Sequence, residues 1–214
     1  MFSKMNDHEI EIATKLINHG LGQGAGSLQQ MLNSPIDIDA IDFNIVNMPK
    51  EAKFSSKVGS KIHVLNTQLI GEIKGICHLV LSEDEVNKVH KACLPESIIT
   101  SQSEEHITLK NELLTEIDNI VAASAITEFA NYLNIKMYGG VPSLLVMDGD
   151  SVNEYMMNEA DSLSSLIQFK AYIHGPELDI IPDFVWLMEE SFIAEIKTFA
   201  ENADDEQLDK LLNK

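Results

Sequence analysis

The stretch LLTEIDNIVAA at residues 113–123 is the part of the sequence from which both fold and function can be approached. Its apolar spacing predicts a helix, on which Glu116 and Asn119 stand about one turn apart and place a carboxylate and an amide on the same side. Pro142 follows, with twenty-two residues between it and Asn119. A solvated helix surface is the simpler explanation of Glu-x-x-Asn alone, because so short a pattern often arises by chance. The added proline makes a chance match much rarer, so the three residues together are candidates for a site.

A damaged copy of this pattern occurs 101 residues earlier in the chain. Lys15 stands at the position of the acid, Asn18 at that of the amide and Ile41 at that of the proline. One offset shared by three positions predicts a duplicated unit, and a duplication of half the chain normally builds a pseudo-symmetric domain rather than a solenoid. Because the earlier copy has lost the acid and the proline, we expect one intact site and one degenerate site.

The composition is that of a globular protein with an acidic surface. The chain has 214 residues, of which 44% are hydrophobic, so it can bury the core of one large domain or of two small ones. Its formal net charge of −19 would repel phosphate backbones and anionic lipid headgroups. We therefore expect no nucleic-acid partner and no membrane insertion, and a basic surface on another protein is a better match.

Neither the cysteines nor the N-terminus indicates secretion. Cys77 and Cys93 lie in apolar segments and outside any Cys-x-x-Cys pair, so we interpret them as reduced structural thiols. The N-terminus lacks the apolar run of a signal peptide, and no apolar stretch approaches the length of a membrane span. These features predict a cytoplasmic protein. The seven histidines show no metal-binding spacing, so we expect no metal site.

Helical and strand patterns alternate through the first half. Asn6 or Asp7 is expected to cap a helix that ends near His19. The Gly-rich run at 20–26 follows this helix rather than a strand, which favours small residues at a close approach of two segments over a nucleotide-binding loop. The other expected elements are a short helix at 27–32, a strand edge or loop at 36–41, strands at 61–69 and 70–81, and a helix from Ser82 to about Leu94.

The second half repeats this order after a polar connection at 96–105. Its first helix is expected to bury a face formed by Leu109, Leu113, Ile117, Ile120 and Ser124, with Glu116 and Asn119 on the flank. The other expected elements are a short helix at 127–133, a hairpin turn at Asp148-Gly149, a strand at 166–173, an apolar segment at 184–188, a helix at 189–200, and a short surface helix or docking segment in the tail.

Residues 113–123 resemble the signature helix of the CheC/CheX/FliY family of bacterial chemotaxis phosphatases, and the chain looks most like the CheC members. The family pattern is Asp or Ser, three residues, Glu, two residues, Asn, twenty-two residues and Pro. Glu116, Asn119 and Pro142 match this pattern in spacing. Glu112 stands where the family has Asp or Ser, which is a departure from it.

The resemblance implies the architecture as well as the site. Residues 15–22, KLINHGLG, resemble the same helix but carry Lys15 in place of the acid and keep Asn18, which implies a degenerate second site. The implied fold is α+β: two pseudo-symmetric halves share an antiparallel sheet, and the motif helices pack on it. We expect one CheC-like domain at 1–200, built from repeats at about 6–95 and 106–200, followed by an acidic tail at 201–214.

The activity implied by the resemblance is hydrolysis of the aspartyl phosphate of a phosphorylated CheY-like response regulator. Asn119 would align the attacking water, and Glu116 would pair with the active-site lysine of the regulator. Glu112 and Pro142 would shape the site. No cofactor of its own is implied, because the Mg²⁺ required for this chemistry is bound by the regulator.

A non-catalytic interaction module is the alternative function. Such a module would resemble the flagellar switch proteins that share this fold without the motif, or an adaptor that binds a CheD-like deamidase and so affects receptor methylation. The degenerate site with Lys15 favours this alternative, because a duplicated site that decays often remains as a docking surface.

Overall fold

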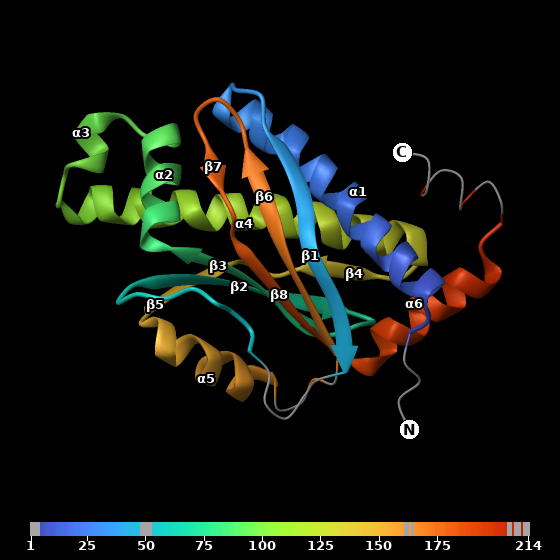
Figure 1. Cartoon of the computed structure of the whole chain (residues 1–214). Coiled ribbons are helices and arrows are strands. Elements are labelled where there is room, and N and C mark those ends of the chain that lie inside the picture. Colours follow the sequence, from blue (N-terminus) through green and yellow to red (C-terminus); the bar gives the residue numbers. More distant parts are fainter. Residues whose placement is uncertain are drawn as a thin grey trace.

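One antiparallel sheet with helices on both faces forms the protein (Figure 1), which confirms the α+β class. The computed structural model describes residues 5–47, 53–160, 163, 165–204, 207 and 211. The helices are α1 (Asp7–Leu32), α2 (Glu83–Cys93), α3 (Glu96–Ile99), α4 (Glu104–Leu133), α5 (Gly149–Glu159) and α6 (Glu190–Asn202). The strands are β1 (Asp37–Asn47), β2 (Ile62–Gly71), β3 (Gly75–Ser82), β4 (Met137–Gly139), β5 (Ser143–Met147), β6 (Ser165–His174), β7 (Asp179–Ile180) and β8 (Asp183–Met188).

The strand order exchanges strands between the two halves of the chain. The sheet runs β1-β6-β8-β3-β2-β4, with β5 also paired to β2 and β7 to β6, and all of these pairings are antiparallel. The first-half strand β1 therefore lies on β6, the second-half strands β4 and β5 lie on β2, and β3 and β8 meet at the centre. A pseudo-twofold domain would have this order. The repeats at 6–95 and 106–200 and the separate tail at 201–214 stay predictions.

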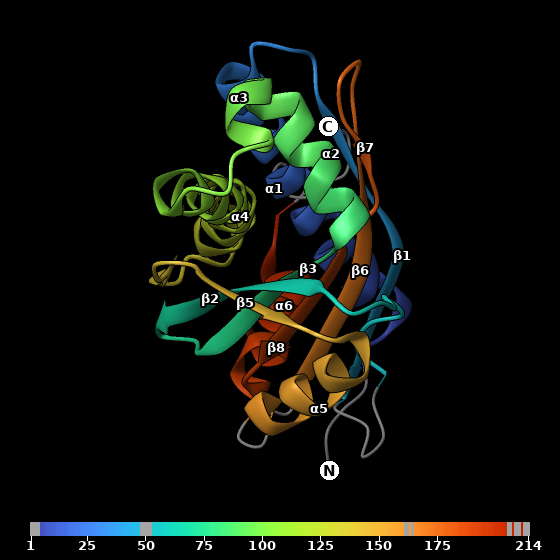
Figure 2. The same ribbon diagram turned by 90° about the vertical axis from the view of Figure 1, so that its left-hand side faces the viewer.

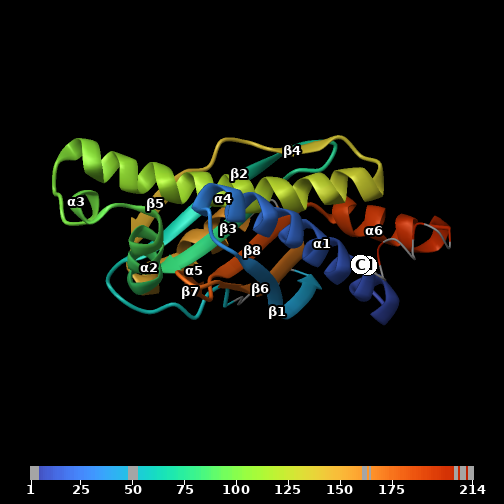
Figure 3. The same ribbon diagram turned by 90° about the horizontal axis from the view of Figure 1, so that it is seen from above.

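The helices α1 and α4 cross in contact over one face of the sheet (Figure 3). The Gly-rich run does not separate two helices, as the sequence predicted, but lies inside the continuous helix α1. A Cβ atom on Gly20 would lie 2.4 Å from the Cα atom of Ala125 on α4, so glycine is needed because the two backbones nearly touch. The predicted separate helix at 127–133 is likewise the last part of α4.

Asparagine ends both long helices in the same way. Asn33 after α1 has φ 49° and Asn134 after α4 has φ 53°, and each donates its backbone N–H to a carbonyl in the last turn of its helix. Asparagine adopts this left-handed conformation more readily than most residues, which makes it a common C-cap. The two caps are also 101 residues apart, the offset of the motif.

Most elements predicted from the alternation of apolar residues are confirmed. The strands expected at 61–69 and 70–81 are β2 and β3, and the strand expected at 166–173 is β6. The helix α2 begins with the expected capping box, in which Ser82 accepts from the backbone of Glu85 and the Glu85 carboxylate accepts from the backbone of Ser82. The segment at 184–188 is the central strand β8, and the helix after it is α6.

One further prediction of local structure is wrong, and two others were incomplete. Asp148-Gly149 is not a hairpin turn: Asp148 caps α5 by accepting from the backbone N–H of Ser151. The polar connection contains the short helix α3. The strand edge at 36–41 is the start of β1, which continues to Asn47 through a bulge where Asp42 has φ 53°.

The apolar core has a layer on each side of the sheet. The larger layer packs α1, α4 and α6 on one face, where Trp186 of β8 contacts Phe129 of α4 edge-on. The smaller layer lies under α5 on the other face (Figure 2) and contains Phe54, Val152 and Met156. No helix in the described part of the chain combines the length and the apolar character needed to cross a bilayer.

Part of the predicted tail packs on the protein. Leu211 is helical and only 2% exposed, and it belongs to the larger core layer. The tail therefore contributes at least this side chain to the core, unlike a purely surface helix. Residues 205, 206, 208–210 and 212–214 lie outside the described residues.

The glycine contact gives a stability prediction. The substitution Gly20→Ala is expected to lower the free energy of unfolding by about 1–3 kcal/mol, because its methyl group would overlap the backbone of α4. The control Gly22→Ala adds a methyl group with nothing within 4 Å among the described residues and should raise the free energy of unfolding by about 0.5–1 kcal/mol. Urea unfolding followed by circular dichroism measures both. Equal effects of the two substitutions would contradict the contact.

Candidate functional site

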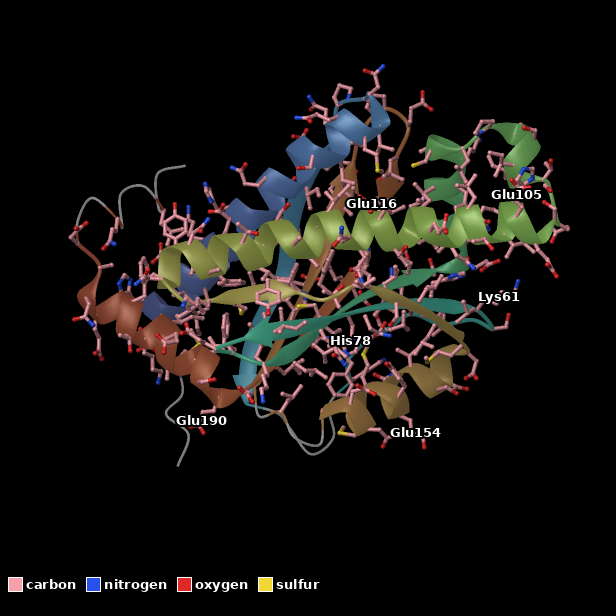
Figure 4. The ribbon with its side chains drawn as sticks, turned by 180° about the vertical axis from the view of Figure 1, so that it is seen from behind. Lys61, His78, Glu105, Glu116, Glu154 and Glu190 are labelled. Atoms are coloured by element: carbon pink, nitrogen blue, oxygen red, sulfur yellow. The ribbon has the colours of Figure 1, made fainter. Side chains whose placement is uncertain are left out.

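The motif helix α4 exposes the two candidate catalytic residues. The apolar side chains that hold this helix on the sheet are Leu114, Ile117 and Val121, all buried. Glu116 and Asn119 lie off this buried face and are exposed. Figure 4 shows Glu116 near the middle of α4, in the layer of the molecule nearest the viewer. Glu116 and Asn119 are therefore both exposed in the structure, as the sequence predicted.

The buried face of α4 differs from the face predicted by the sequence. Leu109 is exposed, Leu113 and Ile120 are only partly buried, and Asp118 is fully buried although it is an acid. The buried stripe is rotated by about one residue, because the helix must also face α1, whose Gly20 approaches Ala125. This rotation leaves the outward side with Glu116 and Asn119 accessible.

Glu116 and Asn119 line an open groove beside the sheet edge. The groove has a volume of about 540 Å³. Its lining combines polar helix residues with an apolar rim and the β4–β5 connection: Ile70, Thr115, Glu116, Asn119, Tyr138, Gly139, Gly140, Val141 and Pro142. The structure thus brings the three motif residues Glu116, Asn119 and Pro142 to one place from two separate elements.

A bulge in the edge strand forms the second wall of the groove. Gly139 pairs with Leu69 of β2 and Ser143 pairs with Asn66, so the edge strand has one more residue than β2 between these pairs. Pro142 lies in this interruption. The strands are not paired there, so the N–H that proline lacks is not needed for a hydrogen bond between them. The backbone N–H of Gly140 donates to the carbonyl of Gln68 over 2.7 Å and holds the bulge against β2.

Glu112 is placed differently from the other predicted site residues. It is exposed one turn before Glu116 on α4, and it is not among the residues that line the groove. Its backbone carbonyl accepts a hydrogen bond from the hydroxyl of Thr115 over 2.8 Å, and Thr115 does line the groove. The catalytic roles of Glu116 and Asn119 and the shaping roles of Glu112 and Pro142 stay predictions.

In the described part of the chain, the earlier copy of the motif differs from the copy that lines the groove. Lys15 is half-buried on α1, and Asn18 on α1 and Ile41 on β1 are exposed. β1 pairs continuously with β6 from Asp37 to Ile41, and its bulge comes only after Ile41. The degenerate character of this site stays a prediction, supported by the cation at Lys15 and the continuous strand.

Sequence reasoning missed a buried acid below the groove. Asp118 is 1% exposed, and its carboxylate Oδ2 accepts a hydrogen bond from the hydroxyl of Thr67 on β2 over 2.8 Å. Burial raises the pKa of Asp118 to about 7, and the Thr67 hydrogen bond opposes this shift. The signal available in the sequence was an acid one residue after Ile117, on the side of the helix that packs on the sheet.

The apolar rim was also missed. Tyr138 and Val141 stand on either side of the two glycines, and the Val141 side chain is 92% exposed. Ile70 of β2 extends this rim. No pattern in the sequence separates these apolar residues from core residues, because strand residues of this type are usually buried.

The described ranges contain no group of three or more His, Cys, Asp or Glu side chains arranged to hold a metal ion. The groove residues include an amide and hydroxyl groups, which can donate hydrogen bonds to an oxyanion, and a carboxylate, which can accept from water or pair with a cation. The absence of a resident metal or cofactor stays an expectation.

Known proteins resemble the chain in sequence and in fold, although no family model matches it. The chain is 21% identical over 160 residues to the CheY-P phosphatase CheC of Bacillus subtilis (strain 168), and the match spans 73% of this chain and 76% of CheC. The structure of Thermotoga maritima FliY matches with a TM-score of 0.72 at 16% identity, over 94% of this chain and 100% of that chain. The middle domain of FliM from Vibrio alginolyticus matches with a TM-score of 0.56 at 13% identity, over 87% of this chain and 99% of that chain.

The buried acid predicts a pH dependence of stability. The pKa of Asp118 is raised in the folded protein, so its contribution to stability is complete below the unfolded pKa of about 4 and is lost as the pH rises toward 7. Relative to Asp118→Asn, the wild type should lose about 2–3 kcal/mol between pH 5 and pH 8. Urea unfolding of both proteins at these pH values is the measurement. A difference that stays constant with pH would contradict the raised pKa.

Proposed function

We propose that this chain, which has the CheC-like fold and is similar to the CheC/CheX/FliY family, hydrolyses the aspartyl phosphate of a CheY-like response regulator. The observation that supports this most is the joint exposure of Glu116 and Asn119 on one open groove, with Pro142 in the opposite wall. The similar protein CheC is named a CheY-P phosphatase, and its match spans most of both chains. The proposal includes a cytoplasmic location.

The groove residues fit what this reaction requires. An aspartyl phosphate is a reactive acyl phosphate, so its hydrolysis chiefly needs a water molecule aligned for in-line attack. The amide of Asn119 can accept a hydrogen bond from this water and donate one to the phosphoryl group, which fixes the direction of attack. The regulator supplies the Mg²⁺ that neutralises the phosphoryl charge.

The carboxylate of Glu116 would hold the partner in register. It stands about one turn before Asn119 on the same side of α4, so a lysine of the regulator that pairs with Glu116 would bring the phosphoryl group to Asn119. The charge-assisted pair would contribute binding and orientation rather than proton transfer. At the earlier copy, Lys15 would repel such a lysine, so we propose a single active site.

The apolar rim supplies a docking surface next to the polar pair. Tyr138, Val141 and Ile70 are exposed around the groove, and exposed apolar side chains beside a polar site commonly form the buried centre of a protein interface. A regulator that places its phosphorylated aspartate at Asn119 would cover this rim and exclude bulk water from the site.

A non-catalytic module is the second candidate, because the FliM middle domain has a similar fold. As such a module the chain would act in a flagellar switch, or as an adaptor for a CheD-like deamidase. Binding of the regulator that is independent of its phosphorylation and unaffected by Glu116→Ala would support the module. Phosphorylation-dependent binding that Glu116→Ala weakens would support the phosphatase.

The groove amide carries the main prediction on activity. Asn119→Ala is expected to reduce acceleration of regulator dephosphorylation roughly a hundredfold, because the water loses its positioning group. Asn18→Ala removes the same type of side chain from the equivalent exposed position of α1 and is the matched control, expected to retain full activity. Phosphate release from a phosphorylated CheY-like regulator is the measurement. If adding the wild-type protein leaves the rate of phosphate release unchanged, phosphatase activity toward that regulator is excluded.

The rim gives a separate prediction on binding. Val141→Asp should raise the KM for the phosphorylated regulator by tenfold or more, since a charge would be buried in the interface, and should change kcat little. Val58→Asp is the matched control, because Val58 is 85% exposed and lies on the loop beside Gly149 rather than at the groove. Steady-state kinetics with both variants test the rim. An equal change in KM for the two would argue against it.

A further inference from the structure

A buried carboxylate lies between the two catalytic candidates in sequence. Asp118 and its hydrogen-bond donor Thr67 are each 1% exposed, while the neighbours Glu116 and Asn119 are exposed on the groove. Within one turn of α4, the side chains of Glu116 and Asn119 therefore face solvent, while the side chain of Asp118 is buried against β2. An ionised acid at this position costs free energy, so its presence calls for a neutral carboxyl, a functional reason, or both.

The partner of Asp118 touches the opposite wall of the groove. Thr67 lies on β2, and its Cγ2 atom is 3.1 Å from the place where a Cβ atom on Gly139 would stand. Gly139 begins the bulge that carries Pro142, and it also approaches Ile126 of α4. The Asp118–Thr67 hydrogen bond thus joins the helix that carries the catalytic candidates to the strand that supports the other wall.

We propose that Asp118 is a positioning residue, which through Thr67 sets the rotation of α4 over β2 and responds to pH by losing its proton. This proposal rests on the proposed phosphatase function. Neutral Asp118 keeps α4 seated on β2, and the groove is then in its active geometry. Ionised Asp118 places a charge in the core, which the helix relieves by shifting toward solvent, and the shift displaces Glu116 and Asn119 together.

The surroundings of Asp118 favour such a response at neutral pH. From β2 it meets the uncharged Thr67, and from β3 the thiol of Cys77, whose own pKa is raised by burial and by the Asp118 charge. Burial is the larger influence on Asp118, and it brings the pKa to about 7. The carboxyl therefore changes from mainly neutral at pH 6 to mainly ionised at pH 8.

The test measures kcat for dephosphorylation of a CheY-like regulator charged with acetyl phosphate, between pH 5.5 and pH 8.5. Wild-type kcat, divided by that of Asp118→Asn at each pH, is expected to fall roughly tenfold from pH 6 to pH 8, while KM follows the same course in both. Asparagine keeps the size of the side chain and the acceptor for Thr67, but it cannot ionise.

Thr67→Val separates positioning from a general loss of packing. Valine has the shape of threonine but donates no hydrogen bond to the ionised carboxylate, so the fall in kcat should move to higher pH. A merely structural role would lower kcat at all pH values without moving the profile. Asp183→Asn is the matched control, since Asp183 is a buried acid on β8 that accepts from the hydroxyl of Ser55 and does not line the groove. It should keep the wild-type profile.

Amide hydrogen exchange makes the test independent of any regulator. After correction for intrinsic exchange, amides 114–122 of the wild type should lose protection above pH 7, and those of Asp118→Asn should not. If this loss of protection is seen but the wild-type protein accelerates dephosphorylation of no regulator, the proposed phosphatase function is wrong, while the positioning role of Asp118 is still supported. If wild type is active but both its kcat ratio and its exchange are flat with pH, Asp118 is not the positioning residue that we propose.

Discussion

The structure depends on the contact between the backbones of α1 and α4. Gly20 leaves no room for a side chain against Ala125, so the two long helices meet closely over one face of the sheet. Their contact fixes which side of α4 faces the core and therefore which side faces solvent. The exposure of Glu116 and Asn119 follows from this geometry and not from their polarity alone, because the equally polar Asp118 is buried.

The sheet supplies the second wall of the site through its edge. β4 and β5 pair with β2 on either side of a one-residue bulge, and Pro142 lies within that bulge. The groove therefore forms where a long helix passes an interrupted edge strand. α1 passes β1 in the other half of the chain, but β1 stays paired up to Ile41, so its bulge comes after the position that corresponds to Pro142 and not before it.

Periodicity in the sequence was sufficient for β2, β3, β6 and α2, whose apolar spacing and capping residues are local signals. Periodicity failed where contacts between residues far apart in the sequence determine the local structure. Glycine disfavours helix interiors in most contexts, and here the close approach of α4 requires one of the glycines of α1, Gly20. Asp148-Gly149 has the composition of a hairpin turn, but Asp148 caps α5. The spacing of Glu116, Asn119 and Pro142 was sufficient to predict that these three residues belong to one site. The burial of Asp118 was missed, because its position next to Ile117 becomes decisive only once the rotation of α4 against β2 is known.

The exchange of edge strands has a consequence for the evolution of the chain. Residues 37–47 complete the sheet beside the second-half strand β6, and residues 137–147 complete it beside the first-half strand β2. Deleting the half that carries Lys15 would remove β1 from β6, β3 from β8 and β2 from β4 and β5, and would remove the helix α1 that contacts α4. Selection on the groove residues of α4 therefore also constrains the half that carries Lys15, because that half supplies the strands and the helix against which α4 and its sheet are packed.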